Sequence, residues 1–105
     1  MSTATATLRK LALGASLCLA GGAAFAQDAA RARLLAANCA NCHGTDGRSQ
    51  GGMPSLAGLP KPYIVLQMQD FRSDKRVATV MHQLAKGYTD AEIDALAGYF
   101  SSVKP

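Results

Sequence analysis

The stretch Cys39-Ala40-Asn41-Cys42-His43, CANCH in one-letter code, carries the most specific chemical signal in this 105-residue sequence. It places two thiols three residues apart, with an imidazole directly after the second. Four kinds of site compete for such a pattern: a zinc site, a dithiol redox centre, a structural disulfide and covalent attachment of a haem. The sequence around the motif decides among them.

The N-terminal quarter of the chain is predicted to be an export signal. Arg9 and Lys10 form a positive start, residues 11–25 are an uncharged apolar run, and residues 24–26 form a small-x-small cleavage site. The apolar run is shorter than the roughly 20 residues needed to cross a bilayer, and no later segment approaches that length. Removal of residues 1–26 therefore predicts an exported, soluble periplasmic protein without stable membrane insertion.

The remaining domain, residues 27–105, contains 79 residues and only two thiols, Cys39 and Cys42, because Cys18 lies inside the signal. Without the two basic residues of the signal, nine Lys and Arg oppose seven Asp and Glu, a net charge of +2. Such a small and scattered charge does not indicate nucleic-acid binding. A domain of this size, with no Trp, also has barely enough apolar residues for a core and often needs a cofactor to complete it.

The context of the motif favours haem attachment over the three alternatives. A structural zinc site needs four ligands, and no second CxxC or HxxxH follows. A dithiol redox motif typically follows a strand, whereas this one follows a predicted helix, and a disulfide across so short a loop stabilises little. In covalent haem attachment, the thiols of Cys39 and Cys42 add to the two porphyrin vinyl groups. The imidazole of His43 is then held at the iron through Nε2.

Hydrophobic periodicity predicts an all-α domain with one long loop. Residues 29–39 form an amphipathic helix that runs into the motif, and residues 44–58 are too rich in Gly, Ser and Pro for a regular element. A second helix begins at residues 60–62, since proline is tolerated in a first turn. Residues 73–76 form a polar break after it.

The last part of the chain is predicted to contain two more helices. Residues 77–85 form a short one that ends at Gly87 as a left-handed cap. Thr89 and Glu92 form a capping box. The final helix then has apolar residues at i, i+3, i+4 and i+7, namely Ile93, Leu96, Ala97 and Phe100.

With His43 on one side of the iron, the second axial position separates electron transfer from catalysis or gas binding at an open site. Met53 lies only ten residues after His43 and has little chain to cross the porphyrin. Met68 is expected to be a core residue of the second helix. Met81, 38 residues downstream of His43, is the predicted thioether ligand, and His82 is the nitrogen alternative.

The sequence resembles the class I cytochromes c of the small bacterial type over residues 34–103. The resemblance rests on CANCHG at 39–44, PSLAGLPKPY at 54–63 and MHQLAKGYTDAEIDALAGYF at 81–100. It implies an all-α class I cytochrome c fold, with helices and a long loop wrapped around one covalently bound haem c.

Within that class, QDFRSDKR at 69–76 and VMHQLAKGYTDAEI at 80–93 are most similar to the haem subunit of flavocytochrome c sulfide dehydrogenase. Free monohaem carriers share these segments. The narrower resemblance implies a flavoprotein subunit, or another redox protein, as partner.

The resemblance also implies a role for particular residues. Cys39 and Cys42 match the thioether cysteines, His43 the proximal ligand and Met81 the distal ligand. Pro54 matches the loop proline whose carbonyl accepts the Nδ1 proton of the proximal imidazole.

Three further positions fall where related proteins have groups near the haem edge or propionates: Tyr63, Gln67 and Arg76. The family also packs its first and last helices across each other. This packing would bury Leu34 or Leu35 against Leu96 and Phe100.

The leading hypothesis is one-electron transfer through a His/Met-ligated haem, without catalytic residues of its own. The chain would accept electrons from the flavoprotein subunit of a sulfide dehydrogenase. The main alternative is a freestanding periplasmic carrier between respiratory complexes and an oxidase or reductase. A less favoured alternative is an open-site haem enzyme or gas sensor, which requires that Met81 is not bound.

Overall fold

The computed structural model describes residues 28–105, and Arg31–Pro105 form one of the two units into which the chain divides. The predicted signal, with Cys18, lies outside the described residues. All regular structure in residues 28–105 is helical, as the sequence predicts, and no strand occurs there. None of the helices in this range is both long and apolar enough to span a membrane.

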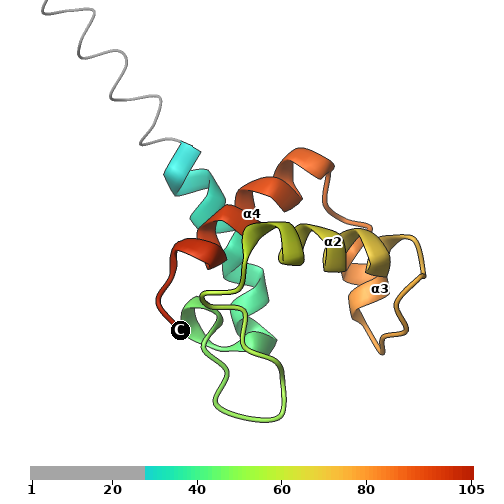
Figure 1. The fold of residues 1–105 in the computed structure, drawn as a ribbon, viewed down its shortest axis with the longest axis horizontal. Coiled ribbons are helices and arrows are strands. Elements are labelled where there is room, and N and C mark those ends of the chain that lie inside the picture. The colour runs from blue at the N-terminus through green and yellow to red at the C-terminus, as the bar shows by residue number, and fades with distance from the viewer. Residues whose placement is uncertain (1–27) are drawn as a thin grey trace, which may run out of the picture. The chain divides into compact units, whose positions relative to one another are not determined.

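Five helical segments follow one another in residues 28–105 (Figure 1). They are a first helix at 28–43, a 3₁₀ turn η1 at Thr45–Gly47, α2 at Lys61–Arg72, α3 at Met81–Ala85 and α4 at Asp90–Ser102. The first helix is longer than predicted, because the CANCH motif forms its last turn instead of following it. Gly44 ends this helix with φ 87°, a conformation that suits glycine.

The prediction for α4 is confirmed in detail. The Thr89 hydroxyl accepts the Glu92 amide proton at 3.2 Å, and the Glu92 carboxylate accepts the Thr89 amide proton at 2.9 Å. This capping box satisfies two of the amide groups that a helix start leaves without partners. The apolar residues predicted for one face of α4 are all buried, namely Ile93, Leu96, Ala97 and Phe100.

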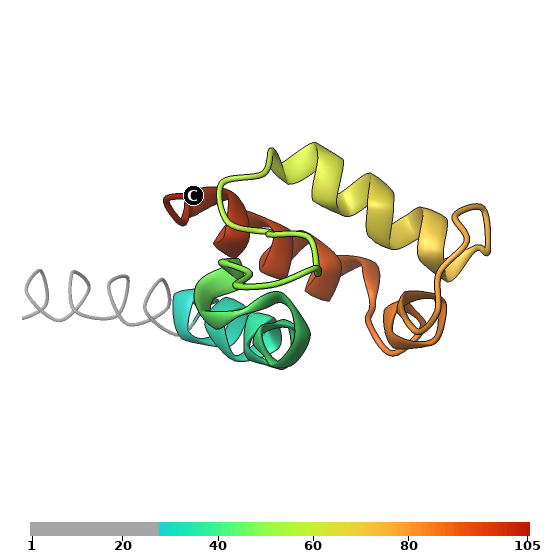
Figure 2. The ribbon, with the colours of Figure 1, turned by 90° about the horizontal axis from the view of Figure 1, so that it is seen from below.

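The first helix packs against α4 through one of the two leucines predicted and through a smaller residue. Leu34 is 73% exposed, whereas Leu35 is partly buried and packs against the core cluster that contains Leu96 and Phe100. Ala36, 2% exposed, joins the core cluster that contains Leu96 and Phe100. Figures 1 and 2 show the two helices crossing, and a short side chain at the contact lets their backbones approach closely.

Helix α2 begins as predicted, with Pro60 at the N-cap position and Pro62 in the first turn. It runs antiparallel to α4 (Figure 1) and contributes Ile64 and Met68 to the core. The Lys61 ammonium lies 2.8 Å from the Asp94 carboxylate at one end of this helix pair. Exposed pairs of this kind contribute about 0–1 kcal/mol, so apolar packing dominates the α2–α4 contact.

The helix predicted at 77–85 is only half formed. Residues 77–80 are irregular, and α3 begins at Met81 with Val80 as its N-cap. Val77, Thr79 and Val80 are β-branched, which lowers their helix propensity. The prediction that Gly87 is a left-handed cap is also wrong. Its φ is not positive, since the described glycines with positive φ are Gly44, Gly47 and Gly58.

The loop at 44–58 is fixed to the end of α4 at its base. The Gly47 carbonyl accepts the Leu56 amide at 2.7 Å and the Ala57 amide at 3.2 Å. The Gly58 amide donates to the Phe100 carbonyl at 2.9 Å. The loop is therefore long, as predicted, but hydrogen bonds hold its two ends together next to the C-terminal part of α4.

Candidate haem-binding site

A cavity of about 320 Å³ lies between the first helix, the 44–58 loop, α2, residues 77–81 and α4. Its walls are mainly aliphatic and aromatic. All eight residues predicted for the site line this one cavity: Cys39, Cys42, His43, Pro54, Tyr63, Gln67, Arg76 and Met81. The fold therefore brings together residues that span more than forty positions of sequence.

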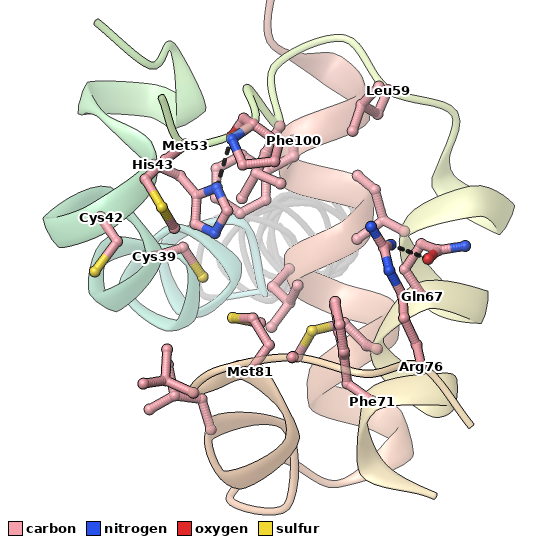
Figure 3. A pocket seen from close by; sticks show the side chains of 18 of the residues that line it. Cys39, Cys42, His43, Met53, Leu59, Gln67, Phe71, Arg76, Met81 and Phe100 are labelled. Atoms are coloured by element: carbon pink, nitrogen blue, oxygen red, sulfur yellow. Dashed lines mark hydrogen bonds between the residues drawn. The ribbon is translucent and has the colours of Figure 1, made fainter. Parts of the chain in front are cut away.

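His43 closes one side of the cavity and is only 8% exposed. Its Nδ1 lies 2.6 Å from the Pro54 carbonyl oxygen, and since a carbonyl only accepts, Nδ1 carries the proton and donates it. This tautomer leaves the lone pair of Nε2 available to a metal. Figure 3 shows the imidazole ring of His43 at the cavity, with the hydrogen bond drawn as a dashed line from one ring nitrogen.

Cys39 and Cys42 are one turn apart at the end of the first helix, and both are free thiols. Burial raises the pKa of the Cys39 thiol above its ordinary value. Redox-active CxxC pairs work through a lowered thiol pKa, whereas burial shifts the pKa of Cys39 in the opposite direction. Within residues 28–105 no three His, Cys, Asp or Glu side chains gather as a metal site.

Met81 is the first residue of α3, and Figure 3 shows its side chain across the cavity from the His43 ring. Met53 also lines the cavity but lies beside His43, on the same side (Figure 3). Met68 is buried in the core, as predicted, and reaches the cavity wall. His82 is not among the lining residues, and its Nδ1 is buried without a hydrogen-bond partner.

Arg76 is the one Lys or Arg among the described residues of the lining, which contains no carboxylate. Its guanidinium donates to the Gln67 side-chain oxygen and lies 4.8 Å from the centre of the Phe71 ring. Two neighbouring groups thus fix the guanidinium at the cavity wall, as Figure 3 shows. A fixed guanidinium in an otherwise uncharged wall suits an anionic group such as a porphyrin propionate.

Sequence reasoning missed several residues of the wall. Val77, Val80 and Leu84 lie in the segment predicted as a short helix and were not predicted for the site, but they line the cavity. Val77 is 96% exposed to the surroundings, so protein atoms do not bury it. The β-branched residues Val77, Thr79 and Val80 were the available sign that this segment is not helical.

These residues fit a haem c. The walls are apolar enough for porphyrin faces, two thiols lie on one helix turn, and a buried imidazole offers Nε2. A thioether lies opposite the imidazole (Figure 3). Arg76 supplies the single positive charge at the wall.

Comparisons with known proteins agree with this chemistry. A family model described as Cytochrome c matches residues 29–104. The cytochrome subunit of sulfide dehydrogenase from Chlorobaculum tepidum is 44% identical over 73 residues, covering 70% of this chain and 66% of the relative. Cytochrome c4 from Pseudomonas aeruginosa is 39% identical over 90 residues, covering 85% of this chain and 45% of the relative. A thiosulfate dehydrogenase electron acceptor from Thiomonas intermedia is 42% identical over 72 residues, covering 67% of this chain and 33% of the relative.

Among solved structures, cytochrome c4 of Acidithiobacillus ferrooxidans matches with a TM-score of 0.60 and 43% identity. The match covers 62% of this chain and 38% of that one. The chain thus spans between a third and two thirds of the length of the relatives named here. The resemblance to class I cytochromes c, and the fold that it predicts, are confirmed. The chain belongs to the cytochrome c family, and its cofactor is a covalently bound haem c for which Cys39 and Cys42 complete the CxxCH motif.

Proposed function

We propose that this chain transfers single electrons through a haem c that is bound to Cys39 and Cys42 and ligated by His43 and Met81. The observation that carries the proposal is the arrangement of one cavity. A buried imidazole, whose Nε2 is left free by the bond to Pro54, faces a thioether across apolar walls. The proposal includes no catalytic residue.

The haem supplies a one-electron couple between ferric and ferrous iron. The protein's contribution is to set the relative stability of the two oxidation states. The Pro54 carbonyl makes the His43 imidazole a stronger donor and fixes its orientation, which favours the ferric state. The Met81 thioether favours the ferrous state. The apolar walls exclude water and keep the surroundings similar in both states.

Substitution of Met81 tests the distal ligand. Coordination of a thioether to ferric haem gives a weak absorption band in the far red, which we expect in the wild-type protein and not in Met81→Ala. Met53→Ala is the matched control, because Met53 lines the same cavity beside His43 and its loss should leave the band intact. Persistence of the band in Met81→Ala, or rapid carbon monoxide binding to ferrous wild-type protein, would favour an open haem site instead.

We further propose that the electron donor is the flavoprotein subunit of a sulfide dehydrogenase. Support comes from the 44% identity to a protein named as the cytochrome subunit of sulfide dehydrogenase. The 42% identity to a thiosulfate dehydrogenase electron acceptor favours the broader function, acceptance of electrons from a dehydrogenase of sulfur compounds. A freestanding carrier is the second candidate, since the chain is also 39% identical to a cytochrome c4.

Purification from the native source separates the two candidates. A flavocytochrome subunit should elute in a constant ratio with a flavin protein, and sulfide should reduce its haem only when that protein is present. Elution alone, without flavin, together with reduction by an unrelated donor, would favour the free carrier.

Export to the periplasm is the remaining part of the proposal. It rests on the signal sequence at 1–26 and on the bacterial relatives. N-terminal sequencing of the mature protein should begin at Gln27. Recovery of haem-free, uncleaved chain from the cytoplasm as the mature form would contradict it.

A further inference from the structure

The Pro54 carbonyl, which accepts the His43 proton, lies on a loop with little packing support. Gly51 and Gly52 precede it, and a Cβ built on either glycine would meet no heavy atom within 4 Å. Pro54 itself is exposed. The position of its carbonyl therefore depends on the hydrogen bonds of the loop.

Two anchors hold the loop close to Pro54. One residue later, the Ser55 hydroxyl oxygen accepts the Ser49 amide proton at 3.0 Å and so joins the two arms of the loop. Two residues later, the Leu56 amide donates to the Gly47 carbonyl at 2.7 Å. The anchor at Leu56 is made by backbone groups, whereas the Ser55 anchor depends on one side chain.

We propose that Ser55 is a positioning residue for the His43–Pro54 hydrogen bond and thereby sets the reduction potential of the haem. Among the described residues, the Ser49–Ser55 bond is the one that ties the arms together beyond the loop base. Without it, the glycine-rich segment before Pro54 gains freedom. The hydrogen bond from His43 Nδ1–H to the Pro54 carbonyl then becomes weaker.

The consequence follows from ligand basicity. A weaker bond from Nδ1–H makes the His43 imidazole a poorer donor to the iron, which destabilises the ferric state. Loss of the Ser55 hydroxyl should therefore raise the reduction potential. This inference rests on the proposed ligation by His43.

The experiment uses holoprotein variants of the two serines. Ser55→Ala should shift the reduction potential upward and accelerate exchange of the His43 Nδ1 proton, measured by NMR in the ferrous state. Ser49→Ala is the matched control, because Ser49 donates through its backbone amide and keeps the bond to Ser55 while losing its own hydroxyl contacts to Gly51. Its potential and exchange rate should equal those of wild type.

Ser55→Thr and Ser55→Val provide a second comparison, since the two side chains share a shape and differ in the hydroxyl. Thr should restore the wild-type potential, and Val should match Ala. This pair decides the question even if the alanine variant yields too little holoprotein.

Two results would overturn the inference. One is a wild-type potential and exchange rate in both Ser55→Ala and Ser55→Val. The other is a shift in Ser49→Ala as large as that in Ser55→Ala, which would mean that any loosening of the loop suffices. The far-red band separates these results from failure of the proposed function. Its absence in wild-type protein refutes the ligation, whereas its presence in every variant without a shift refutes only the role of Ser55.

Discussion

Replacement of Gly47 by alanine should strongly destabilise the domain, because two separate costs meet at this residue. Gly47 has φ 76°, in the left-handed region that costs a residue with a Cβ about 1–2 kcal/mol. A Cβ there would lie 2.8 Å from Cδ1 of Phe100 and 3.0 Å from the Ala57 amide nitrogen. Phe100 is 1% exposed, and a Cβ this close to its ring forces the ring or the loop to shift, so overpacking adds about 1–3 kcal/mol. Together these costs amount to about 2–5 kcal/mol, a large share of the 5–15 kcal/mol that typically stabilises a domain.

Denaturant unfolding of the holoprotein measures this free energy. Gly52→Ala is the control, because Gly52 lies in the same loop, lacks a positive φ and has open space around a Cβ. Its unfolding free energy should stay within about 0.5 kcal/mol of wild type. If Gly47→Ala unfolds at the same denaturant concentration as Gly52→Ala, the packing of the loop base on Phe100 described here is wrong.

Three further predictions concern the N-cap of α4, the hydrogen bond between Tyr99 and Asp46, and the attachment of the haem. Thr89→Ala should cost about 1 kcal/mol in denaturant unfolding, because it removes the hydroxyl that caps α4, and Thr89→Ser should restore it. The hydrogen bond to the Asp46 carboxylate raises the pKa of Tyr99 above its ordinary value of about 10, so the folded state favours the protonated phenol. Stability from this bond is complete below about pH 10 and is lost as pH rises through the raised pKa, so Tyr99→Phe should show a smaller alkaline loss of unfolding free energy than wild type. Replacement of both Cys39 and Cys42 by alanine should give a haem-free chain without cooperative thermal unfolding by circular dichroism, and a sharp wild-type transition would contradict this.

The parts of the fold that the sequence predicts well are those with local signals. The capping box and the apolar spacing of α4 lie within twelve consecutive residues, and each is satisfied inside that window. Pro60 and Pro62 likewise locate the start of α2, because proline is favoured in a first helical turn. These signals need no knowledge of the partner that each helix packs against.

The errors concern residues whose environment is set by distant segments. The resemblance to cytochromes c leaves Leu34 and Leu35 as alternatives for the contact with α4; Leu35 packs against the core there, and the small residue Ala36, which was not predicted, is buried beside it. Periodicity also predicts a helix from Val77, because apolar spacing does not distinguish residues that face protein from residues that face a cofactor cavity.

The residues of the candidate site likewise fall into those with a local sequence signal and those that depend on distant segments. The CxxCH motif is contiguous, so Cys39, Cys42 and His43 could be assigned from their chemistry alone. Pro54 and Arg76 could not, because their contacts to His43 and Gln67 depend on how loops close. The resemblance to cytochromes c supplied these two positions, and the structure adds the contacts that each one makes.

The small size of the core and the apolar lining of the cavity are related. The largest fully buried side chains in the described residues are only Phe100, Ile93 and Leu96, while apolar residues such as Val77 and Leu84 face the cavity. These cavity-facing residues leave water only when a porphyrin lies against them, so their hydrophobic contribution belongs to the holoprotein. Attachment of haem therefore stabilises the native state. The same loop that packs on Phe100 at its base also presents the Pro54 carbonyl to His43, so the residues that stabilise the fold and those proposed to set the reduction potential lie close together in sequence.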